Sequence, residues 1–190
     1  MHKFEKWMVN SKLTSLLHKK ILFPSFFKFV NKELKGTALE IGCGVGKTTE
    51  EIARRYKKLI ITAVDYDKEQ IIVAQKRGLQ NVTFKQGDAT KLPFKMSSFD
   101  YVIETNTFHH IKNYQRAIRE VHKVLKNRGT FYVMDISRYF FIWPLSLLFP
   151  PESYFTKEEF KADLERNGFK VEKLKGRFVF LIAAVKGSIV

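Results

Sequence analysis

The stretch from Ala38 to Gly46 constrains the fold of this chain more than any other. Apolar residues lead into Glu40, and glycines then occupy positions 42, 44 and 46. The residues that follow, 47–56, have the composition of a helix. Glycines permit positive φ and close backbone approach, and a helix N-terminus favours an anionic group. The pattern therefore predicts a strand, a glycine turn and a helix that together bind a nucleotide-like cofactor.

Strand-like and helical patterns alternate along the rest of the chain, which is typical of βαβ crossovers and a parallel sheet. The expected strands are 37–41, 59–65, 82–86, 99–104, 130–136, 169–174 and 177–185. The expected helices are 47–56, 68–77, one within 111–126, and 156–167, with two more before residue 36. We therefore predict an α/β fold: a Rossmann-like, doubly wound, mostly parallel seven-stranded sheet with helices on both faces and an N-terminal helical extension. In such sheets ligands bind at the carboxyl ends of the strands.

The composition indicates one folded domain. The chain has 190 residues, and its hydrophobic content of 45% is enough to bury a core. It contains no internal repeat and no linker-like segment. We expect one domain over residues 1–190. Its expected parts are a helical segment at 1–35, a cofactor-binding core at 36–136, an apolar lid-like insertion at 137–155, and a helix with strands at 156–190.

Cysteine content and apolar runs restrict the compartment and the cofactors. Cys43 is the only cysteine, which excludes an internal disulfide and a thiolate metal cluster. No apolar run approaches the roughly 20 residues of a spanning helix, and no signal peptide is evident. These features predict a cytoplasmic protein without a bound metal, at most peripheral to a membrane.

The net charge of +15 has three open explanations: nucleic acid, an anionic membrane surface, or a host with lysine-rich proteins. The excess is strongest between Met1 and Lys35, where eight lysines face two glutamates. Apolar residues recur there at roughly helical spacing. We expect these helices to pack on the domain edge, with a basic amphipathic flap as the alternative. The oligomeric state stays open.

The spacing of the glycines separates three possible cofactors. A phosphate-binding loop needs four residues between its first glycine and the Gly-Lys pair, whereas Gly42 and Gly46 are separated by three. A dinucleotide-binding turn has Gly-x-Gly-x-x-Gly, and here the third glycine comes one position early. Asp65 would still serve as a ribose ligand. An NAD(P)-dependent Rossmann enzyme therefore remains as a weaker alternative.

From Ala38 to Asp135 the chain resembles the class I S-adenosylmethionine-dependent methyltransferases, in particular those that act on small molecules. The motifs that carry the resemblance are Glu40-x-Gly42-x-Gly44-x-Gly46, Val64-Asp65, Gly87-Asp88-Ala89 with Leu92-Pro93-Phe94, and Phe99-Asp100-Tyr101-Val102 running to Phe108-His109-His110. The chain departs from the family at Asn127-Arg128-Gly129, where a Pro-Gly-Gly type of turn is usual, and at Lys47, where a small or neutral residue is usual.

The resemblance implies S-adenosyl-L-methionine as the cofactor and S-adenosyl-L-homocysteine as its product. The implied cofactor-binding residues are Glu40, Gly42, Cys43, Gly44, Gly46, Asp65, Tyr66, Asp88, Ala89 and Glu104. Glu40 would orient the amino group, Asp65 would accept the ribose hydroxyls, and Glu104 would lie near the sulfonium. Tyr66 would lie against the adenine, which Asp88 and the following N–H would bind. A negatively lined site suits a ligand that carries two cationic groups.

Methyl transfer from a sulfonium is an in-line displacement, and a base is needed only when the nucleophile arrives protonated. His109 and His110 are the candidate catalytic residues, because imidazole titrates near neutrality. An ordinary packing role in a helix-entry turn is an equal alternative for both. Tyr139 and Tyr154 are weaker candidates.

The acceptor is inferred from the segments that flank the site. Two apolar, Phe-rich segments, 21–30 and 139–149, lie where related folds build substrate lids, and both adjoin basic residues. We expect a small hydrophobic or amphiphilic acceptor, such as a lipid head group or a prenylated ring, met at an anionic membrane surface.

A protein that binds or modifies RNA or DNA through the basic N-terminal segment is the alternative from another class. It predicts an affinity that falls steeply with salt. The chain has no recognisable nucleic-acid-binding module, which disfavours this alternative. A cofactor-binding protein without catalysis is a third option.

Overall fold

The computed structural model describes residues 18–138 and 155–187 of the chain. The expected helix before residue 18 and the apolar segment 139–149 lie outside these residues, as do Tyr139 and Tyr154. No helix in the described ranges is long and apolar enough to cross a membrane.

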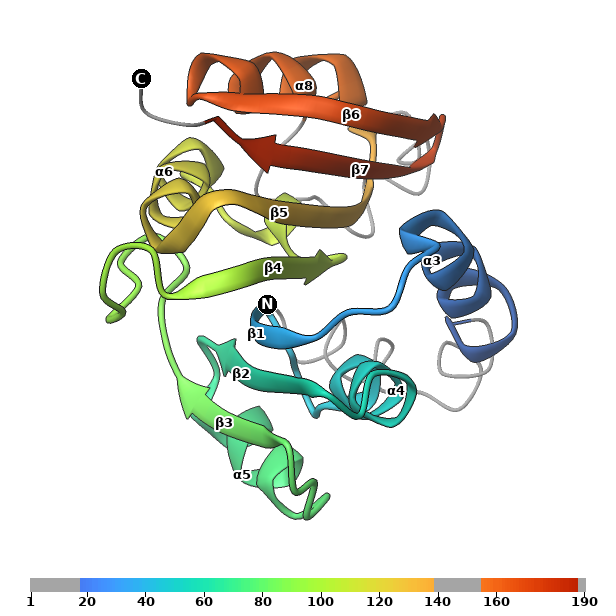
Figure 1. Cartoon of the computed structure of the whole chain (residues 1–190), viewed down its shortest axis with the longest axis vertical. Coiled ribbons are helices and arrows are strands. Elements are labelled where there is room, and N and C mark those ends of the chain that lie inside the picture. The colour runs from blue at the N-terminus through green and yellow to red at the C-terminus, as the bar shows by residue number, and fades with distance from the viewer. Residues whose placement is uncertain (1–17, 139–154, 188–190) are drawn as a thin grey trace.

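The described residues form a seven-stranded sheet with the strand order β3-β2-β1-β4-β5-β7-β6 (Figure 1). Its strands are β1 (Gly36–Ile41), β2 (Leu59–Asp65), β3 (Val82–Gln86), β4 (Phe99–Thr105), β5 (Leu125–Ile136), β6 (Phe169–Gly176) and β7 (Val179–Lys186). The five strands from β3 to β5 pair in parallel, whereas β7 pairs antiparallel with both β5 and β6. This arrangement confirms the predicted α/β fold.

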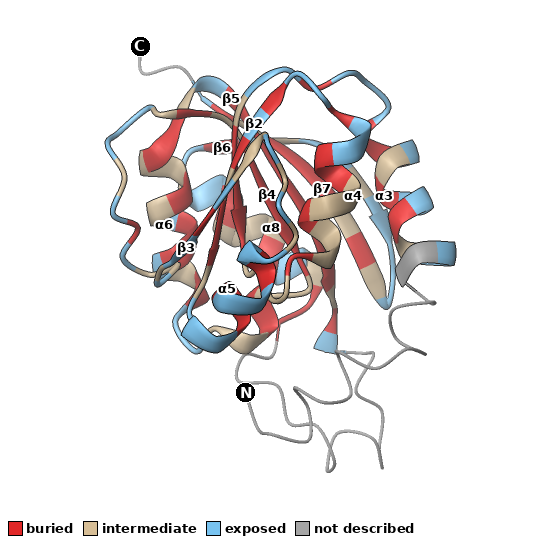
Figure 2. Ribbon diagram, turned by 90° about the horizontal axis from the view of Figure 1, so that it is seen from below, coloured by how far each residue is buried: buried red, intermediate tan, exposed pale blue. Residues whose placement is uncertain are grey.

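Helices cover both faces of the sheet (Figure 2). The described helices are η1 (His18–Leu22), α3 (Phe23–Val30), α4 (Lys47–Arg55), α5 (Lys68–Gln75), the short η2 (Phe108–His110), α6 (Tyr114–Val124) and α8 (Lys157–Arg166). Helices α3, α4 and α5 share one hydrophobic cluster with the sheet, and α6 and α8 share the other. The sheet is therefore buried on both sides, as its nearly continuous apolar strands require.

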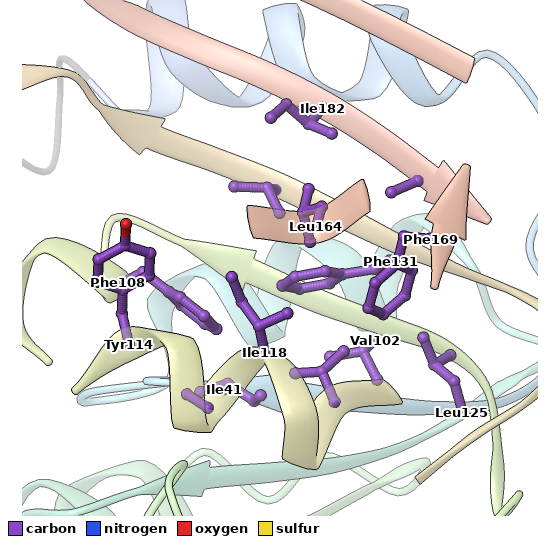
Figure 3. Close-up of a cluster of buried hydrophobic side chains, with 14 of the residues drawn as sticks. Ile41, Val102, Phe108, Tyr114, Ile118, Leu125, Phe131, Leu164, Phe169 and Ile182 are labelled. Atoms are coloured by element: carbon purple, nitrogen blue, oxygen red, sulfur yellow. The ribbon is translucent and has the colours of Figure 1, made fainter. Parts of the chain in front are cut away.

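The period of two along each strand decides which side chains face which helices. Leu39 and Ile41 pack in the cluster that contains α6 and α8, where Ile118, Phe131 and Leu164 interlock (Figure 3). Ala38 packs in the opposite cluster with α3 and α4. Glu40, which alternates with Leu39 and Ile41, therefore points to the α3–α4 side of the sheet.

Helix α3 has Pro24 in its first turn and packs its buried side against the sheet. Phe26 and Phe29 lie in the same hydrophobic cluster as Tyr56 and Tyr132. This part of the N-terminal segment is an ordinary packed helix on the domain edge. It agrees with the packing interpretation of the apolar stripe rather than with a mobile flap.

The helix expected within residues 111–126 is α6, which begins at Tyr114 because Asn113 takes a non-helical φ of −112°. Two other predicted boundaries were wrong. Residues 127–129, expected to be a turn before the fifth strand, lie inside β5, with Arg128 at a φ of 61°. The pairing of β4 with β5 shifts register between Phe99 and Tyr101, and this irregularity accommodates the extra residues. The expected helix 68–77 ends at Gln75.

Candidate active site

The sheet brings four acidic residues to one edge. Strands β3, β2, β1 and β4 are neighbours, so their carboxyl ends lie next to one another. Ile41 pairs with both Val64 and Glu104, and Asp65 pairs with Gln86. Glu40, Asp65, Asp88 and Glu104 therefore surround the glycine turn from four strands. This is the edge at which sheets of this type bind ligands.

The glycine turn has the conformation that its sequence predicts. Gly42, Gly44 and Gly46 have φ values of 72°, 53° and 77°, which favour glycine. A Cβ atom on Gly42 would lie 2.0 Å from Oγ1 of Thr107, so any larger residue would collide with the β4 end. The turn leads directly into α4, whose N-cap is Gly46.

The N–H groups of the turn are already used within the protein. The N–H groups of Gly42 and Cys43 donate to the Val64 carbonyl at 2.8 and 3.1 Å, and Gly46 donates to the Cys43 carbonyl at 2.9 Å. Gly44 donates to Oδ2 of Asp65 at 2.8 Å. These four N–H groups are therefore satisfied within the protein. The turn offers close approach rather than these donors.

Asp65 links the turn to the end of β2. Its Oδ2 accepts from the Gly44 N–H and its Oδ1 accepts from the Asp67 N–H at 2.9 Å. Its backbone carbonyl accepts from Gly87 at 2.9 Å, which ties the end of β3 to the same point. A carboxylate held in this way presents two acceptor oxygens side by side, the arrangement that two neighbouring hydroxyls require. Asp65 is therefore a rigidly placed acceptor.

Glu40 is a buried carboxyl group without a hydrogen-bond partner. Its side chain is 1% exposed, and neither carboxyl oxygen is hydrogen-bonded within the described part of the chain. Burial raises the pKa of Glu40 to about 7; the adjacent Thr49 hydroxyl opposes this shift and the Asp65 carboxylate adds to it. Buried acceptors are normally satisfied, so this one indicates a missing donor. A cationic ligand group would meet that need.

The residues present fit the cofactor that the sequence motifs imply. The unpartnered Glu40 would bind an ammonium group, and the carboxylate of Asp65 at the end of β2 would accept hydroxyls. Among residues 18–138 and 155–187, no group of three His, Cys, Asp or Glu side chains is arranged to hold a metal ion.

A second set of buried polar groups lies at the ends of β4 and β5. Glu104 and Asp135 are both 0% exposed and face the α6 side of the sheet. Burial, and then the neighbouring Asp135, raise the pKa of Glu104 well above its usual range. Oε1 of Glu104 accepts from the Thr107 N–H at 2.6 Å, but Oε2 has no partner among the described residues. Oδ1 of Asn106 and Oγ of Ser137, just after the same two strands, also have no hydrogen-bond partner among the described residues.

The two candidate histidines differ in their surroundings. The His109 side chain is buried, and its Nδ1 lies 2.5 Å from Oδ1 of Asp135. The backbone N–H of His109 donates to Oδ2 of the same carboxylate at 3.2 Å. His110 lies against it, with ring centroids 3.9 Å apart. Burial, and then His109, lower the pKa of His110 to about 3. The contact with Asp135 therefore orients His109 as a general base. The lowered pKa of His110 makes that imidazole a poor base.

The other predicted cofactor residues have less distinctive surroundings. Tyr66 is 77% exposed beside the end of β2. Asp88 is exposed and accepts from the N–H and hydroxyl of Thr90 at 2.8 Å each, while Ala89 is half-buried. Cys43 is buried, and burial raises the pKa of its thiol, so the side chain is unreactive. The positions are compatible with the roles implied for them, which remain predictions.

Sequence reasoning missed three residues that shape this site. Arg77, just after α5, donates from Nε to the Val45 carbonyl at 2.6 Å and from Nη1 to Glu50. It thereby fixes the glycine turn to α4. Thr107 fills the space over Gly42, and Asp135 holds His109. Asp135 alone had a readable signal, since it is an acid at the end of an otherwise apolar strand.

The profile of a family described as "methyltransferase domain" matches residues 39–133, half of the chain. The chain therefore belongs to the class I S-adenosylmethionine-dependent methyltransferase family. It is similar to the uncharacterized methyltransferase YcgJ of Bacillus subtilis, with 39% identity over 101 residues, 51% of this chain and 39% of that protein. The YcgJ crystal structure has the same fold, with a TM-score of 0.73 at 21% identity over 87% of this chain and 98% of that one.

Two further relatives carry more specific names. The 2-methyl-6-phytyl-1,4-hydroquinone methyltransferase 2 of Oryza sativa is 32% identical over 146 residues, 72% of this chain and 40% of that protein. The demethylmenaquinone methyltransferase of Staphylococcus aureus is 31% identical over 108 residues, 55% of this chain and 45% of that protein. The chain thus spans about two fifths of the length of these curated relatives.

Proposed function

We propose that this protein transfers a methyl group from S-adenosyl-L-methionine to a small hydrophobic or amphiphilic acceptor by in-line displacement. The observation that carries the proposal is the buried, unpartnered carboxyl group of Glu40 beside the glycine turn. A buried carboxyl without a donor costs stability. It is explained if the site is built for a ligand that brings a cationic group.

The cofactor-binding roles follow from the geometry of the edge. Glu40 binds the ammonium group, and the Gly42–Gly46 turn forms the floor beneath the methionine moiety. Asp65, held in place by the N–H groups of Gly44 and Asp67, accepts the two ribose hydroxyls. Tyr66 and Asp88, at the ends of β2 and β3, bind the adenine. The bound cofactor supplies an electrophilic methyl group on a positively charged sulfur.

The chain's own residues orient the acceptor and remove its proton. Asp135 accepts the Nδ1–H of His109 and so selects the tautomer in which Nε2 is the basic ring nitrogen, the one that takes the proton of the nucleophile. Burial and the neighbouring Asp135 raise the pKa of Glu104, which favours its neutral form and allows Oε2 to act as a hydrogen-bond donor. A neutral Glu104 also avoids two carboxylates in one buried space.

The acceptor class is supported by the relatives and by the sequence. Acceptors named for relatives vary in chemistry, but two of them are a phytyl hydroquinone and a demethylmenaquinone. In the sequence, the apolar segment 139–149 begins two residues after Ser137, whose Oγ has no partner among the described residues. An acceptor with one polar, proton-bearing end and an apolar body matches these two environments. We expect the enzyme to be cytoplasmic and to meet this acceptor at a membrane surface.

A methyl-transfer assay tests the proposal. The protein is incubated with methyl-labelled S-adenosylmethionine and either a phytyl-substituted hydroquinone in micelles or a hydroquinone without the chain. We expect the label to enter the phytyl compound at least about 10-fold faster, because only this acceptor gains from apolar burial. The Asp65→Ala variant should be inactive, and Glu165→Gln on the exposed side of α8 is its control. Equal rates for the two acceptors would refute the hydrophobic acceptor.

A further inference from the structure

A groove runs between α3 and α4, which lie side by side in both views of the fold (Figures 1 and 2). It consists of two adjoining hollows of about 410 and 760 Å³. Phe27, Lys28 and Arg55 line both hollows and join them. No role in the proposed methyl transfer uses this groove, which lies on the outer side of the two helices.

The groove carries more positive than negative charge. Its basic residues are Lys28, Lys32, Arg54 and Arg55, and its acidic residues are Glu33 and Glu51. The positive surface continues past the end of α4, where the Lys58 carbonyl accepts from Gly36 and so brings the exposed Lys35 and Lys58 together. The exposed cations in or beside α3 and α4, and those just before β1 and β2, thus form one basic surface.

Three of these cations have no carboxylate partner among the described residues: Lys28, Lys32 and Arg55. Aromatic rings hold two of them instead. The Arg55 guanidinium lies 5.0 Å from the Phe27 ring centroid, and the Lys32 ammonium lies 5.5 Å from that of Tyr101. A ring contact places a cation without neutralising it. The charges therefore stay available to an external anion.

The arrangement fits several anions spread over a surface better than one compact anion. The cations are exposed and come from separate elements, and none of them closes around a single point. Ile21, which is 56% exposed, adds an apolar side chain in η1, just before α3. Base stacking is disfavoured, because the groove's Phe23 and Tyr56 rings are 6% and 2% exposed and the Arg55 guanidinium lies over the half-buried Phe27 ring. A lipid bilayer presents phosphates spread over a surface, offers an apolar layer to Ile21, and requires no base stacking.

We propose that the α3–α4 groove is the surface with which this domain docks on a membrane of anionic phospholipids. The phosphate groups bind to Lys28, Lys32 and Arg55, and Ile21 enters the head-group region. The inference rests on the proposed function in one respect: an acceptor that resides in the bilayer requires the enzyme at its surface. The groove then assigns the face that touches the lipid.

Vesicle co-sedimentation with the full chain tests the inference at about 0.1 M salt, where long-range attraction is screened. The vesicles contain equal parts of phosphatidylglycerol and phosphatidylcholine, and vesicles of phosphatidylcholine alone are the reference. The groove variant is Lys28→Glu with Arg55→Glu. The control is Arg116→Glu with Arg119→Glu, which changes the charge equally at exposed positions of α6. Titration with S-adenosylhomocysteine checks that both variants keep the folded cofactor site.

We expect the groove variant to lose at least about 10-fold in vesicle affinity and the control to lose less than about 3-fold. Equal losses in both variants would show that only net charge matters and would overturn the inference. Wild-type protein that ignores the anionic vesicles would overturn it as well. Vesicle binding and cofactor binding are measured separately. Loss of vesicle binding alone counts against the docking surface, whereas failure of the wild-type protein to bind S-adenosylhomocysteine in the titration counts against the proposed methyl transfer.

Discussion

Nδ1 of His109 lies 2.5 Å from Oδ1 of Asp135, and both side chains are buried at adjoining strand ends. The carboxylate fixes the tautomer of the imidazole and stabilises the positive charge that the ring gains when it accepts a proton. The sequence offers two neighbouring histidines as candidate bases, and this contact distinguishes them. It makes His109 the catalytic candidate and Asp135 its positioning residue.

Asp135→Asn should therefore lower kcat by about 10²-fold while leaving the affinity for S-adenosylhomocysteine unchanged. The amide can hold the ring but cannot stabilise its protonated form. His110→Gln is the matched comparison, because the depressed pKa of His110 makes it a poor base, and it should cost less than about 3-fold. Steady-state kinetics measure both variants. A larger loss for His110→Gln than for Asp135→Asn would contradict this assignment.

Glu40→Gln should make the apoprotein more stable at pH 8 but not at pH 5. The pKa of Glu40 is about 7 in the folded protein and 4.5 ordinarily, so ionisation of this carboxyl opposes folding increasingly between these pH values. The cost is present in full above pH 7 and amounts to about 3 kcal/mol. The neutral amide avoids it. Thermal unfolding at the two pH values measures the difference, with Glu165→Gln as the control.

The same substitution should weaken cofactor binding by at least about 10-fold, since it removes the charge that faces the ammonium group. For the unmodified protein, affinity should rise as the pH passes through 7, because the carboxyl must ionise to bind a cation. Stability and binding thus change in opposite directions at one residue. If Glu40→Gln binds the cofactor normally, the role assigned to Glu40 is wrong.

Arg77→Lys should raise the dissociation constant of the cofactor by about 10-fold with little change in unfolding temperature. Lysine cannot reach the Val45 carbonyl and Glu50 together, so the glycine turn loses its attachment to α4. Arg54→Lys is the control, since Arg54 pairs with the same Glu50 from an exposed position. Titration calorimetry compares the two. Equal effects would show that Arg77 has no special role in positioning the turn.

Gly42→Ala should destabilise the fold by more than about 2 kcal/mol. The positive φ alone costs about 1–2 kcal/mol, and the new methyl group would lie 2.0 Å from Oγ1 of Thr107. Thr107→Gly should therefore rescue part of the loss when it is combined with Gly42→Ala, as denaturant unfolding of the double-mutant cycle would reveal. Strict additivity of the two substitutions would contradict a direct steric contact.

The sequence was sufficient for the architecture and for the edge of the sheet at which the candidate residues meet. Strands β1, β2 and β3 lie within a residue of their predicted bounds, because apolar runs between turn residues leave little choice. The four acids reach one edge because parallel strands end together. The spacing of Gly42, Gly44 and Gly46 likewise predicts the positive φ values that the turn adopts.

The rest depends on contacts between residues far apart in the chain. Arg77 contacts Val45, which is 32 positions earlier in the chain, and His109 contacts Asp135, which is 26 positions later. No local sequence pattern indicates either contact. The early start of β5 at Leu125 comes from pairing with Phe99 across an irregular ladder, which overrides the turn-like Asn127-Arg128-Gly129. The use of the turn's N–H groups within the protein also became visible only in the structure.

Calorimetric titration of the full chain at pH 8 tests the central claim most directly. S-adenosylhomocysteine and NADH are added separately to the unmodified protein, to Asp65→Ala and to Glu165→Gln. We predict that S-adenosylhomocysteine binds to the unmodified protein and to Glu165→Gln, that Asp65→Ala loses most of this affinity, and that NADH binds to none of them. Binding of NADH without binding of S-adenosylhomocysteine would contradict the assignment of this site to a methyl donor.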